Sequence, residues 1–497
     1  MNLAAIIDSH PSDATALVSR GRSTTYGELR EHVAGLRAGL AGLGLEPGDR
    51  LAVLAGNNWY FVASYLAALG AGLVVVPLNP GSPARELERE LDSVGVRAIV
   101  VGPTGRSSFA SIDRARVPTL EHVIVTEGVE CEGAVLLDEL VSSDPMPMIE
   151  RSEHDVAVLM FTSGTAGFPK AAMLSHGNLL ANIDQAQRAE GRHQTSDDVT
   201  LGVLPLFHIF GLNVVLGLSL AAGSSVVLVE RFDPSSCLET VTNHSITIIP
   251  GAPTMWAAWA ALPDVAADAF ASVRFAASGA ARLAPEVAQT IERRFGVTIS
   301  EGYGLTEASP IVTSSSGVRT SFGSIGVPLP GVHVRLVDLD DDDVLVGDAG
   351  EVWVQGPNVF KGYWDDPEAT ASALTGDGWL RTGDVAVVDD AGHLFLVDRA
   401  KDLIIVSGFN VFPAEVEEVL LEMPGVTAAA VVGVAHPHTG EAVKAYVVVE
   451  PGRAFEEDDI IAFCANNLAK YKCPDKVMFV DELPTNPGGK IVRRALR

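Results

Sequence analysis

The stretch Phe161–Lys170, FTSGTAGFPK, holds three hydroxyl side chains, two glycines, a proline and a terminal lysine in ten residues. It follows the apolar run VAVLM at 156–160, which is typical of a buried strand. Glycine exposes backbone amides, and successive amides in a turn form a concavity that binds anions. The hydroxyl groups and Lys170 would add donors and a positive charge. The stretch therefore predicts a loop that holds phosphate groups.

The same loop does not match the common nucleotide-binding loop, Gly-x-x-x-x-Gly-Lys-[Ser/Thr]. Pro169 precedes the lysine and Ala171 follows it. An ordinary strand-to-helix turn is the alternative interpretation, because glycine and serine are common in turns. If the loop binds a nucleotide, it belongs to a different family of sites.

Helical and strand patterns alternate on both sides of this loop. Thr25 and Glu28 form a capping-box pattern before a helix that ends near Gly44, and a Val-rich run follows. Such alternation predicts a parallel sheet with helices on its faces. From about Gly331 the chain alternates polar and apolar residues, which favours antiparallel β-structure. We expect an α/β fold: a large N-terminal domain (1–399) of layered α/β subdomains plus a β-rich subdomain, and a small α+β domain (400–497).

The composition and the N-terminal sequence argue against nucleic-acid-binding, secreted and membrane-spanning proteins. A formal net charge of −28 argues against nucleic acid as a partner. The four cysteines form no Cys-x-x-Cys pair, and the N-terminus lacks the pattern of a signal peptide, so we expect a reducing, cytoplasmic location. The apolar stretch 214–229 is broken by Gly-Ser-Ser, and we interpret it as globular core rather than a membrane span.

Five motifs occur in a fixed order along nearly the whole chain. They are FTSGTAGFPK, EGYGLTE at 301–307, WLRTGD at 379–384, DRAKDLIIVSGFNVFPAEVE at 398–417 and NPGGKIVRR at 486–494. In this order they resemble the adenylate-forming superfamily of acyl-CoA synthetases, adenylation domains and luciferases. The resemblance implies two half-reactions at one site. A carboxylate first attacks the α-phosphate of ATP, giving acyl-AMP and pyrophosphate, and a thiol, usually that of coenzyme A, then takes the acyl group.

The resemblance also implies roles for residues that hold the triphosphate. The β- and γ-phosphates are expected to lie against Thr162, Ser163, Gly164, Thr165, Gly167 and Lys170. Ala166 and Ala171 stand where the family more often has threonine and glycine. The backbone amides survive both changes, so we expect weakened rather than lost binding.

The motif at 301–307 would hold the rest of the nucleotide. By resemblance, Tyr303 stacks on adenine, Thr306 donates to the α-phosphate, and Glu307 holds Mg²⁺, a hard cation that prefers oxygen ligands. The remaining adenine-site residues of this expectation are Gly279, Ala280, Ala281, Glu301, Gly302 and Gly304.

The C-terminal motifs would complete the reaction. By resemblance, Asp384 and Arg399 bind the ribose, and Lys490 bridges the substrate carboxylate and the α-phosphate during adenylation. The small domain is expected to be mobile and to swing about Lys401 between the half-reactions, after which Ser407, Gly408 and Phe409 line the passage for CoA. His208 is either a residue beside the reacting carboxylate or a packed histidine at a strand end.

The acid itself is less well defined by the sequence. The segment 253–270 is almost wholly apolar, which suits a medium- or long-chain fatty acid, and Trp256 and Trp259 could shorten an acyl tunnel. Gly302 stands where malonate-type relatives have arginine. An aryl or branched acid, or transfer of the acyl group to a carrier protein, remain the alternatives. No extra segment separates Tyr303 from Arg399, which favours CoA. Transient membrane contact and the oligomeric state stay open.

Overall fold

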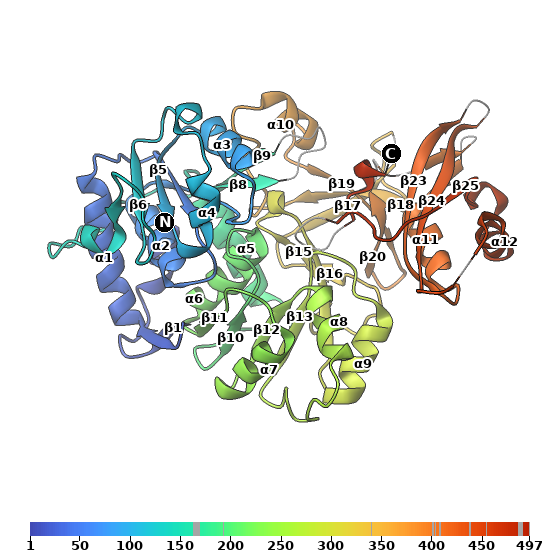
Figure 1. Ribbon diagram of the computed structural model, residues 1–497, viewed down its shortest axis with the longest axis horizontal. Helices are drawn as coiled ribbons and strands as arrows, with labels where there is room; N and C mark the ends of the chain where they lie inside the picture. Colours follow the sequence, from blue (N-terminus) through green and yellow to red (C-terminus); the bar gives the residue numbers. More distant parts are fainter. Residues whose placement is uncertain are drawn as a thin grey trace. The chain divides into compact units, whose positions relative to one another are not determined.

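The structure is a computed structural model of the 497-residue chain. It describes every residue except 163–168, 192, 339, 400, 401, 403, 407, 408, 437, 438, 454, 486–490 and 497. At 398, 399, 405, 409, 410, 440 and 494 it describes the backbone alone. The chain divides into two compact units (Figure 1). The first unit comprises 1–333 and 354–380, and the second comprises 334–353 and 381–497. The second unit thus groups residues from before Arg399 with the C-terminal part of the chain.

A seven-stranded sheet forms one layer of the first unit among the described residues. Its order is β7-β6-β5-β3-β4-β8-β9, parallel throughout except for the final antiparallel pair β8/β9. The strands are β3 (Arg50–Leu54), β4 (Val74–Pro77), β5 (Val96–Val101), β6 (His122–Val125), β7 (Val135–Leu136), β8 (Val156–Thr162) and β9 (Lys170–Ser175). Helix α2 (Trp59–Gly70) packs on β3 and β4, and α1 (Tyr26–Gly42) packs on α2. The near-continuous Val-rich strands therefore reflect burial of both sheet faces, as the alternating pattern predicts.

A nine-stranded sheet forms the second layer. Its order is β16-β15-β14-β13-β12-β10-β11-β1-β2, parallel in the middle with antiparallel edges. The strands are β1 (Thr15–Ser19), β2 (Arg22–Thr25), β10 (Val199–Gly202), β11 (Ser225–Leu228), β12 (Ile248–Gly251), β13 (Phe275–Ser278), β14 (Ile299–Gly304), β15 (Ile311–Ser314) and β16 (Val327–Pro328). Strand β1 pairs with β11, so the N-terminal segment completes a sheet otherwise built from residues after 198.

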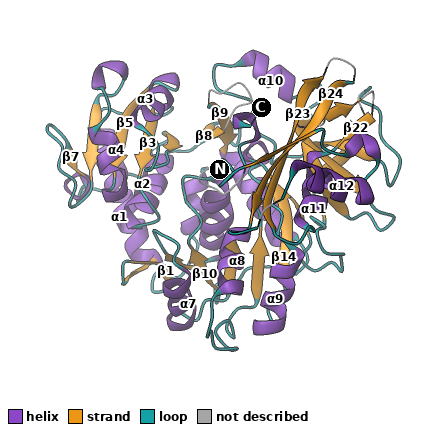
Figure 2. Ribbon diagram, turned by 45° about the vertical axis from the view of Figure 1, so that its right-hand side comes forward, coloured by secondary structure: helices purple, strands orange, loops and turns teal. Residues whose placement is uncertain are grey.

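Further helices of the first unit flank these sheets (Figure 2). They are α3 (Ala84–Ser93), α4 (Arg106–Ala110), α5 (His176–Arg188), α6 (Leu218–Ala222), α7 (Pro234–Asn243), α8 (Pro253–Ala261), α9 (Pro285–Phe295) and α10 (Pro367–Ala373). The capping box at the start of α1 is confirmed, because the Glu28 amide donates to Thr25 Oγ1 at 3.2 Å and the Thr25 amide donates to Glu28 Oε2 at 2.8 Å. The apolar stretch 214–229 forms the end of a π-helix, η5 (Phe210–Gly217), then α6 and β11. No helix of the described residues has the length and apolar character needed to cross a bilayer.

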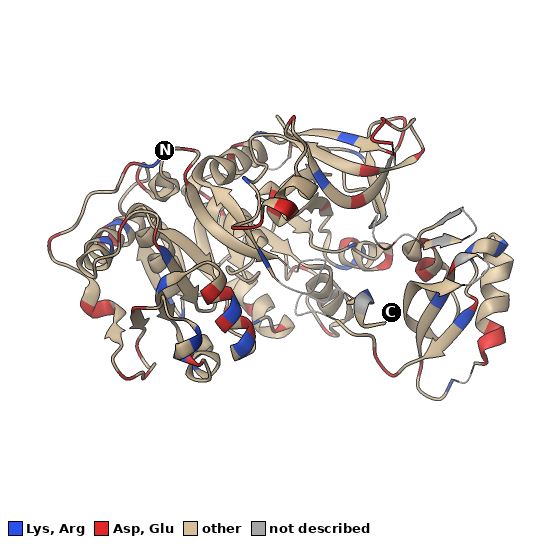
Figure 3. Ribbon diagram, turned by 90° about the horizontal axis from the view of Figure 1, so that it is seen from above, with Lys and Arg blue, Asp and Glu red and all other residues tan. Residues whose placement is uncertain are grey.

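The second unit is rich in β-structure, as the sequence predicts. One sheet has the order β17-β18-β19-β20, with β17 (His333–Val337), β18 (Ala349–Gln355), β19 (Leu380–Val388) and β20 (Leu394–Arg399). The other joins β21 (Ile404–Val406), β22 (Phe409–Val411), β23 (Val426–His436), β24 (Gly440–Val449) and β25 (Lys476–Phe479), and is accompanied by α11 (Pro413–Leu421) and α12 (Glu457–Asn467). In the part of the chain that the structure describes, acidic and basic residues are interspersed along the ribbon (Figure 3). The α/β fold with a small C-terminal α+β part is therefore confirmed.

Candidate active site

The predicted phosphate loop connects two antiparallel strands rather than a strand and a helix. Thr162, the last residue of β8, pairs with Lys170, the first residue of β9. The Thr162 hydroxyl also donates to the Lys170 carbonyl at 3.5 Å. The loop is therefore closed at its base by a hairpin. Four predicted phosphate-binding residues, Ser163, Gly164, Thr165 and Gly167, lie outside the described residues.

Lys170 has two partners that sequence reasoning did not identify. Its Nζ atom lies 3.6 Å from Asp366 Oδ2. The same atom lies 5.2 Å from the centroid of the Tyr363 ring, within the range of a cation–π contact. Both partners come from a segment almost 200 residues further along the chain. The cation at the end of the loop is thus held in place by an anion and an aromatic ring.

The motif at 301–307 turns sharply between β14 and the short 3₁₀ turn η6 (Thr306–Ala308). A Cβ atom at Gly304 would lie only 2.3 Å from the carbonyl oxygen of Pro310, so glycine is required where β14 and β15 approach. Tyr303 is only 8% exposed, and Thr306 and Glu307 are half-buried. Glu307 Oε1 accepts a hydrogen bond from the Tyr363 hydroxyl at 2.8 Å. This contact brings the predicted magnesium ligand and Lys170 to the same tyrosine.

The other predicted wall of the adenine site lies at the end of β13, the strand that pairs with β14. A Cβ atom at Gly279 would lie 2.9 Å from the Phe210 ring, and Ala280 adopts a positive φ of 70°. Glu301, on β14, accepts a hydrogen bond from the Leu283 amide at 3.3 Å, which ties the 279–283 turn to β14. Burial raises the pKa of the Glu301 carboxyl above its ordinary value.

His208 lies just before η5. Its Nδ1 accepts a hydrogen bond from the Phe210 amide at 3.3 Å, so the amide requires this nitrogen to be unprotonated. Part of the ring reaches solvent, yet the surrounding protein desolvates it and lowers the pKa of the imidazole. The exposure of His208 does not fit a packed histidine at a strand end, whereas a neutral imidazole fits a place beside the reacting carboxylate.

The two tryptophans of α8 belong to the core. The indole N–H groups of Trp256 and Trp259 donate to the carbonyls of Ala277 and Pro234 at 3.2 and 3.0 Å, and both side chains have 0% exposure. Trp259 also makes edge-to-face contacts with Phe270 and Phe232. This packing explains their sequence spacing without an open tunnel wall, and it gives no support to the expectation that they shorten a tunnel.

The predicted ribose residues lie in the second unit. Asp384 on β19 and Arg399 on β20 are direct cross-strand partners, so the fold brings these two positions together. Asp384 is 9% exposed. The predicted hinge Lys401, the CoA-passage residues Ser407 and Gly408, and Lys490 lie outside the described residues; Phe409 is described by its backbone alone, as the first residue of β22.

Sequence reasoning missed the segment Asn358–Asp366, which contains both partners of Lys170. Its letters, NVFKGYWDD, carry one local signal, an Asp-Pro pair typical of a helix start, and Asp366 indeed caps α10. Nothing in that pattern indicates contacts with residues 170 and 307, because such contacts depend on tertiary packing.

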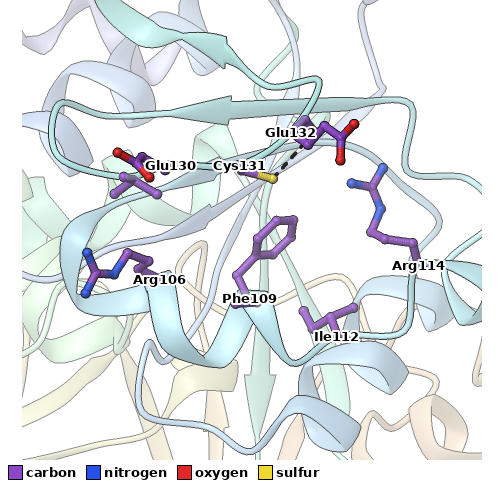
Figure 4. A pocket seen from close by; sticks show the side chains of 9 residues that line it. Arg106, Phe109, Ile112, Arg114, Glu130, Cys131 and Glu132 are labelled. Atoms are coloured by element: carbon purple, nitrogen blue, oxygen red, sulfur yellow. Dashed lines mark hydrogen bonds between the residues drawn. The ribbon is translucent and has the colours of Figure 1, made fainter.

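The described residues also line a cavity of about 220 Å³ between α4 and the segment 129–132 (Figure 4). Phe109 and Ile112 give it an apolar side, and Arg106 and Arg114 flank it. None of the predicted site residues lines this cavity.

The available metal ligands suit a cation that arrives with its substrate. Among the described residues, no three His, Cys, Asp or Glu side chains are grouped so that they could hold a metal ion. Protein-bound Mg²⁺ commonly uses one or two carboxylates together with substrate phosphates and water. Glu307, the predicted magnesium ligand, fits that donor set.

Two family models match this chain. The model of the AMP-binding enzyme family matches residues 3–364. The chain belongs to the AMP-binding enzyme family. The model of the AMP-binding enzyme C-terminal domain matches residues 415–490 of this chain.

Relatives of this ligase cover almost its whole length. It is 39% identical over 486 residues to a feruloyl-CoA synthase of Amycolatopsis, covering 97% of this chain and 95% of the relative. It is 34% identical over 514 residues to a long-chain-fatty-acid–CoA ligase of Bacillus subtilis, covering 97% and 91%. The crystal structure of ATP-bound MatB from Rhodopseudomonas palustris superposes with a TM-score of 0.91 at 33% identity, covering 100% of this chain and 98% of that one. The predicted resemblance is confirmed, and the protein is an AMP-forming acid–thiol ligase of the acyl-CoA synthetase type.

Proposed function

We propose that this ligase activates a medium- or long-chain fatty acid as acyl-AMP, with MgATP as the co-substrate, and transfers the acyl group to coenzyme A. One observation carries the catalytic part of the proposal. Lys170 and Glu307, which the sequence assigns to phosphate and Mg²⁺, contact the ring and the hydroxyl of one residue, Tyr363. A triphosphate with its metal needs such a pair, a cation and a hard carboxylate, in one place.

The residues of the first unit would divide the work as follows. The hairpin loop and Lys170 bind the β- and γ-phosphates, while Tyr303 and the Gly279–Ala281 turn enclose adenine. Thr306 donates to the α-phosphate, Glu307 holds Mg²⁺, and His208 lies beside the carboxylate. Mg²⁺ supplies charge neutralisation of the phosphates when it is bound.

The residues of the second unit would serve ribose binding and the change of half-reaction. The cross-strand pairing of Asp384 with Arg399 supports a shared role at the ribose hydroxyls. Lys490 would deliver a positive charge to the adenylation transition state. Lys401 would act as the hinge, and Ser407, Gly408 and Phe409 would line the CoA passage.

Apart from the core residues Trp256, Trp259 and Phe270, the segment 253–270 is still mostly apolar, which supports a fatty acid because each buried methylene contributes about 0.8 kcal/mol. The relatives act on different acids by their names, a feruloyl group and a long-chain fatty acid. The test below therefore compares acids of both classes and of graded chain length.

The test is ATP–pyrophosphate exchange with fatty acids of graded length and with aryl acids such as ferulate, followed by addition of CoA. The fatty acid methyl esters serve as controls, because they lack the attacking carboxylate. We expect exchange to increase with chain length and CoA thioester to form on addition of CoA. If only aryl acids support exchange, the substrate is an aryl acid rather than a fatty acid. If exchange occurs but no CoA thioester forms, the acceptor is a carrier protein rather than CoA. The absence of ATP–pyrophosphate exchange with every acid would contradict adenylation itself.

A further inference from the structure

The segment Asn358–Asp366, which we call the bridging segment, is joined by backbone hydrogen bonds to strand β9. The Met173 amide donates to the Gly362 carbonyl at 2.9 Å, and the Lys361 amide donates to the Met173 carbonyl at 3.0 Å. The Trp364 amide donates to the Ala171 carbonyl at 2.8 Å. The bridging segment therefore continues the sheet beside the strand that begins with Lys170.

The same segment is joined to the turn that carries Glu307. The Phe360 amide donates to the Glu307 carbonyl at 2.8 Å. The Asn358 side-chain amide donates to the Ala308 carbonyl at 2.9 Å. The bridging segment thus connects the two motifs that the proposed function assigns to phosphate and to Mg²⁺, although it belongs to neither.

Tyr363 contacts both motifs with its side chain. Its hydroxyl donates to Glu307 Oε1 at 2.8 Å, and Lys170 Nζ lies 5.2 Å from its ring centroid. The tyrosine hydroxyl is a hydrogen-bond donor and the carboxylate of Glu307 is an acceptor, so the two groups are complementary. The hydrogen bond fixes the direction in which the Glu307 carboxylate points.

The surroundings fix the orientation of this tyrosine and of Lys170. Phe360 packs edge-on against the Tyr363 ring, with centroids 4.9 Å apart and planes at 75°. The Tyr363 amide donates to Thr370 Oγ1 at 2.9 Å. Asp366 uses Oδ1 to cap α10 through the Ala369 amide at 2.9 Å, while its Oδ2 lies 3.6 Å from Lys170 Nζ.

We propose that Tyr363 is a positioning residue that fixes the Lys170 ammonium group and the Glu307 carboxylate relative to each other, so that a triphosphate and its Mg²⁺ bind at the same time. A neutral phenol contacts both side chains, so the cation and the carboxylate share one rigid neighbour. The hydroxyl orients the carboxylate, and the ring face orients the cation. This inference rests on the proposed function, because it takes Glu307 as a magnesium ligand and Lys170 as a phosphate ligand.

The variant Tyr363→Phe separates the two contacts, because it keeps the ring under Lys170 and removes only the hydroxyl. We expect the Mg²⁺ concentration for half-maximal ATP–pyrophosphate exchange to rise about tenfold, since the lost hydrogen bond is to a charged group. The KM for ATP at saturating Mg²⁺ should change by less than about twofold. Tyr363→Leu, which also removes the ring face, should raise the KM for ATP in addition.

A measurement without turnover provides an independent readout. ATP with Mg²⁺ should raise the melting temperature of the wild type more than ATP with EDTA, and Tyr363→Phe should shrink that difference. The control is Tyr60→Phe, the same atomic change on α2 of the same unit, which should leave both readouts unchanged.

The outcomes distinguish this inference from the function on which it rests. Wild-type protein that shows no exchange with any acid contradicts the proposed function. Wild-type protein that exchanges normally, while Tyr363→Phe shows the wild-type Mg²⁺ dependence and thermal shift, overturns the positioning role. An equal loss of exchange at every Mg²⁺ concentration also overturns it, because a merely structural defect has that signature.

Discussion

Two glycine-containing loop motifs of this ligase each end in a lysine, Lys170 in the first and Lys490 in the second. The described residues that flank the two motifs differ. The first loop is closed by the pair Thr162 and Lys170, so its lysine is itself a strand residue. The second loop motif, 486–490, is flanked by the bridged pair Thr485 and Ile491, and Lys490 itself lies outside the described residues. Lys170 is held by Asp366 and by the Tyr363 ring. The described contacts therefore hold the cation of the first loop in a fixed place.

The base of the second loop is nevertheless firmly anchored within its unit. The Val492 amide donates to the Pro484 carbonyl at 2.8 Å. Arg493 makes ion pairs with Glu417 at 2.7 Å and with Asp402 at 3.5 Å. The side chains of Arg493, Glu417 and Asp402 are 18%, 13% and 12% exposed, so this cluster is mostly buried. The second unit thus fixes the position of the loop base through α11 and the region next to the predicted hinge.

The largest expected effect comes from removing the lysine of the second loop. Lys490→Ala should slow adenylation by about a hundred- to a thousandfold, by analogy with loss of one transition-state donor. Thioester formation from supplied acyl-AMP should be largely spared. Rapid-quench measurement of each half-reaction checks this, with Lys476→Ala on the exposed strand β25 as the control. Equal slowing of both half-reactions would remove the functional contrast between the two loops.

The next effect concerns the strand that holds Lys170. His176 follows β9 directly and is fully buried; its Nδ1 accepts a hydrogen bond from the Leu3 amide at 3.0 Å, and its Nε2 has no hydrogen-bond partner in the described structure. Burial, followed by the charge of Arg151, lowers the pKa of His176 from 6.5 to about 4. The unfolded chain therefore binds more protons between these values, and the free energy of unfolding should fall by about 3 kcal/mol as the pH drops from 6.5 to 4.

Urea unfolding of the wild type and of His176→Asn across that pH range checks this prediction. Asparagine can still accept the Leu3 hydrogen bond but does not titrate, so its stability should decline less steeply as the pH falls. Parallel pH profiles for the two proteins would show that His176 does not carry the effect.

A smaller effect is expected at the base of the second loop. Arg493→Ala leaves two mostly buried carboxylates without this partner and should reduce the stability of the second unit by about 2 kcal/mol. Arg493→Lys keeps a positive charge without the planar guanidinium and should lose less. Thermal unfolding followed by near-ultraviolet circular dichroism provides the measurement. If both variants have the melting temperature of the wild type, the ion pairs of Arg493 do not contribute to the stability of the second unit.

The sequence predicted the features that depend on local pattern. The alternation of helices and Val-rich strands predicted the parallel sheets, and Thr25 with Glu28 predicted the start of α1. The alternative interpretation of the loop after Thr162, a turn from a strand into a helix, is wrong, because the loop connects the antiparallel strands β8 and β9. Short antiparallel edge strands such as β9 are hard to distinguish from a loop, because pairing rather than pattern defines them.

The contacts that join the motifs could not be predicted in this way. Tyr363 reaches Glu307 across 56 residues, and Lys170 reaches Asp366 across almost 200. Such contacts arise from how β9, η6 and α10 pack, and no single-sequence period encodes them. The burial of Trp256 and Trp259 was missed for the same reason, because the sequence of an apolar helix face is the same whether the face lines a tunnel or packs in the core.

The pairing of β1 with β11 has a consequence for biosynthesis. Leu17 and Val18 pair with Thr24 and Ser23 on the neighbouring strand β2, but on their other side their partners are Val226 and Val227 on β11. During translation the apolar strand β1 must therefore leave the ribosome long before the strand that shields it exists. Nascent chains shorter than about residue 228 should expose this strand to chaperones and proteases, and longer ones should protect it.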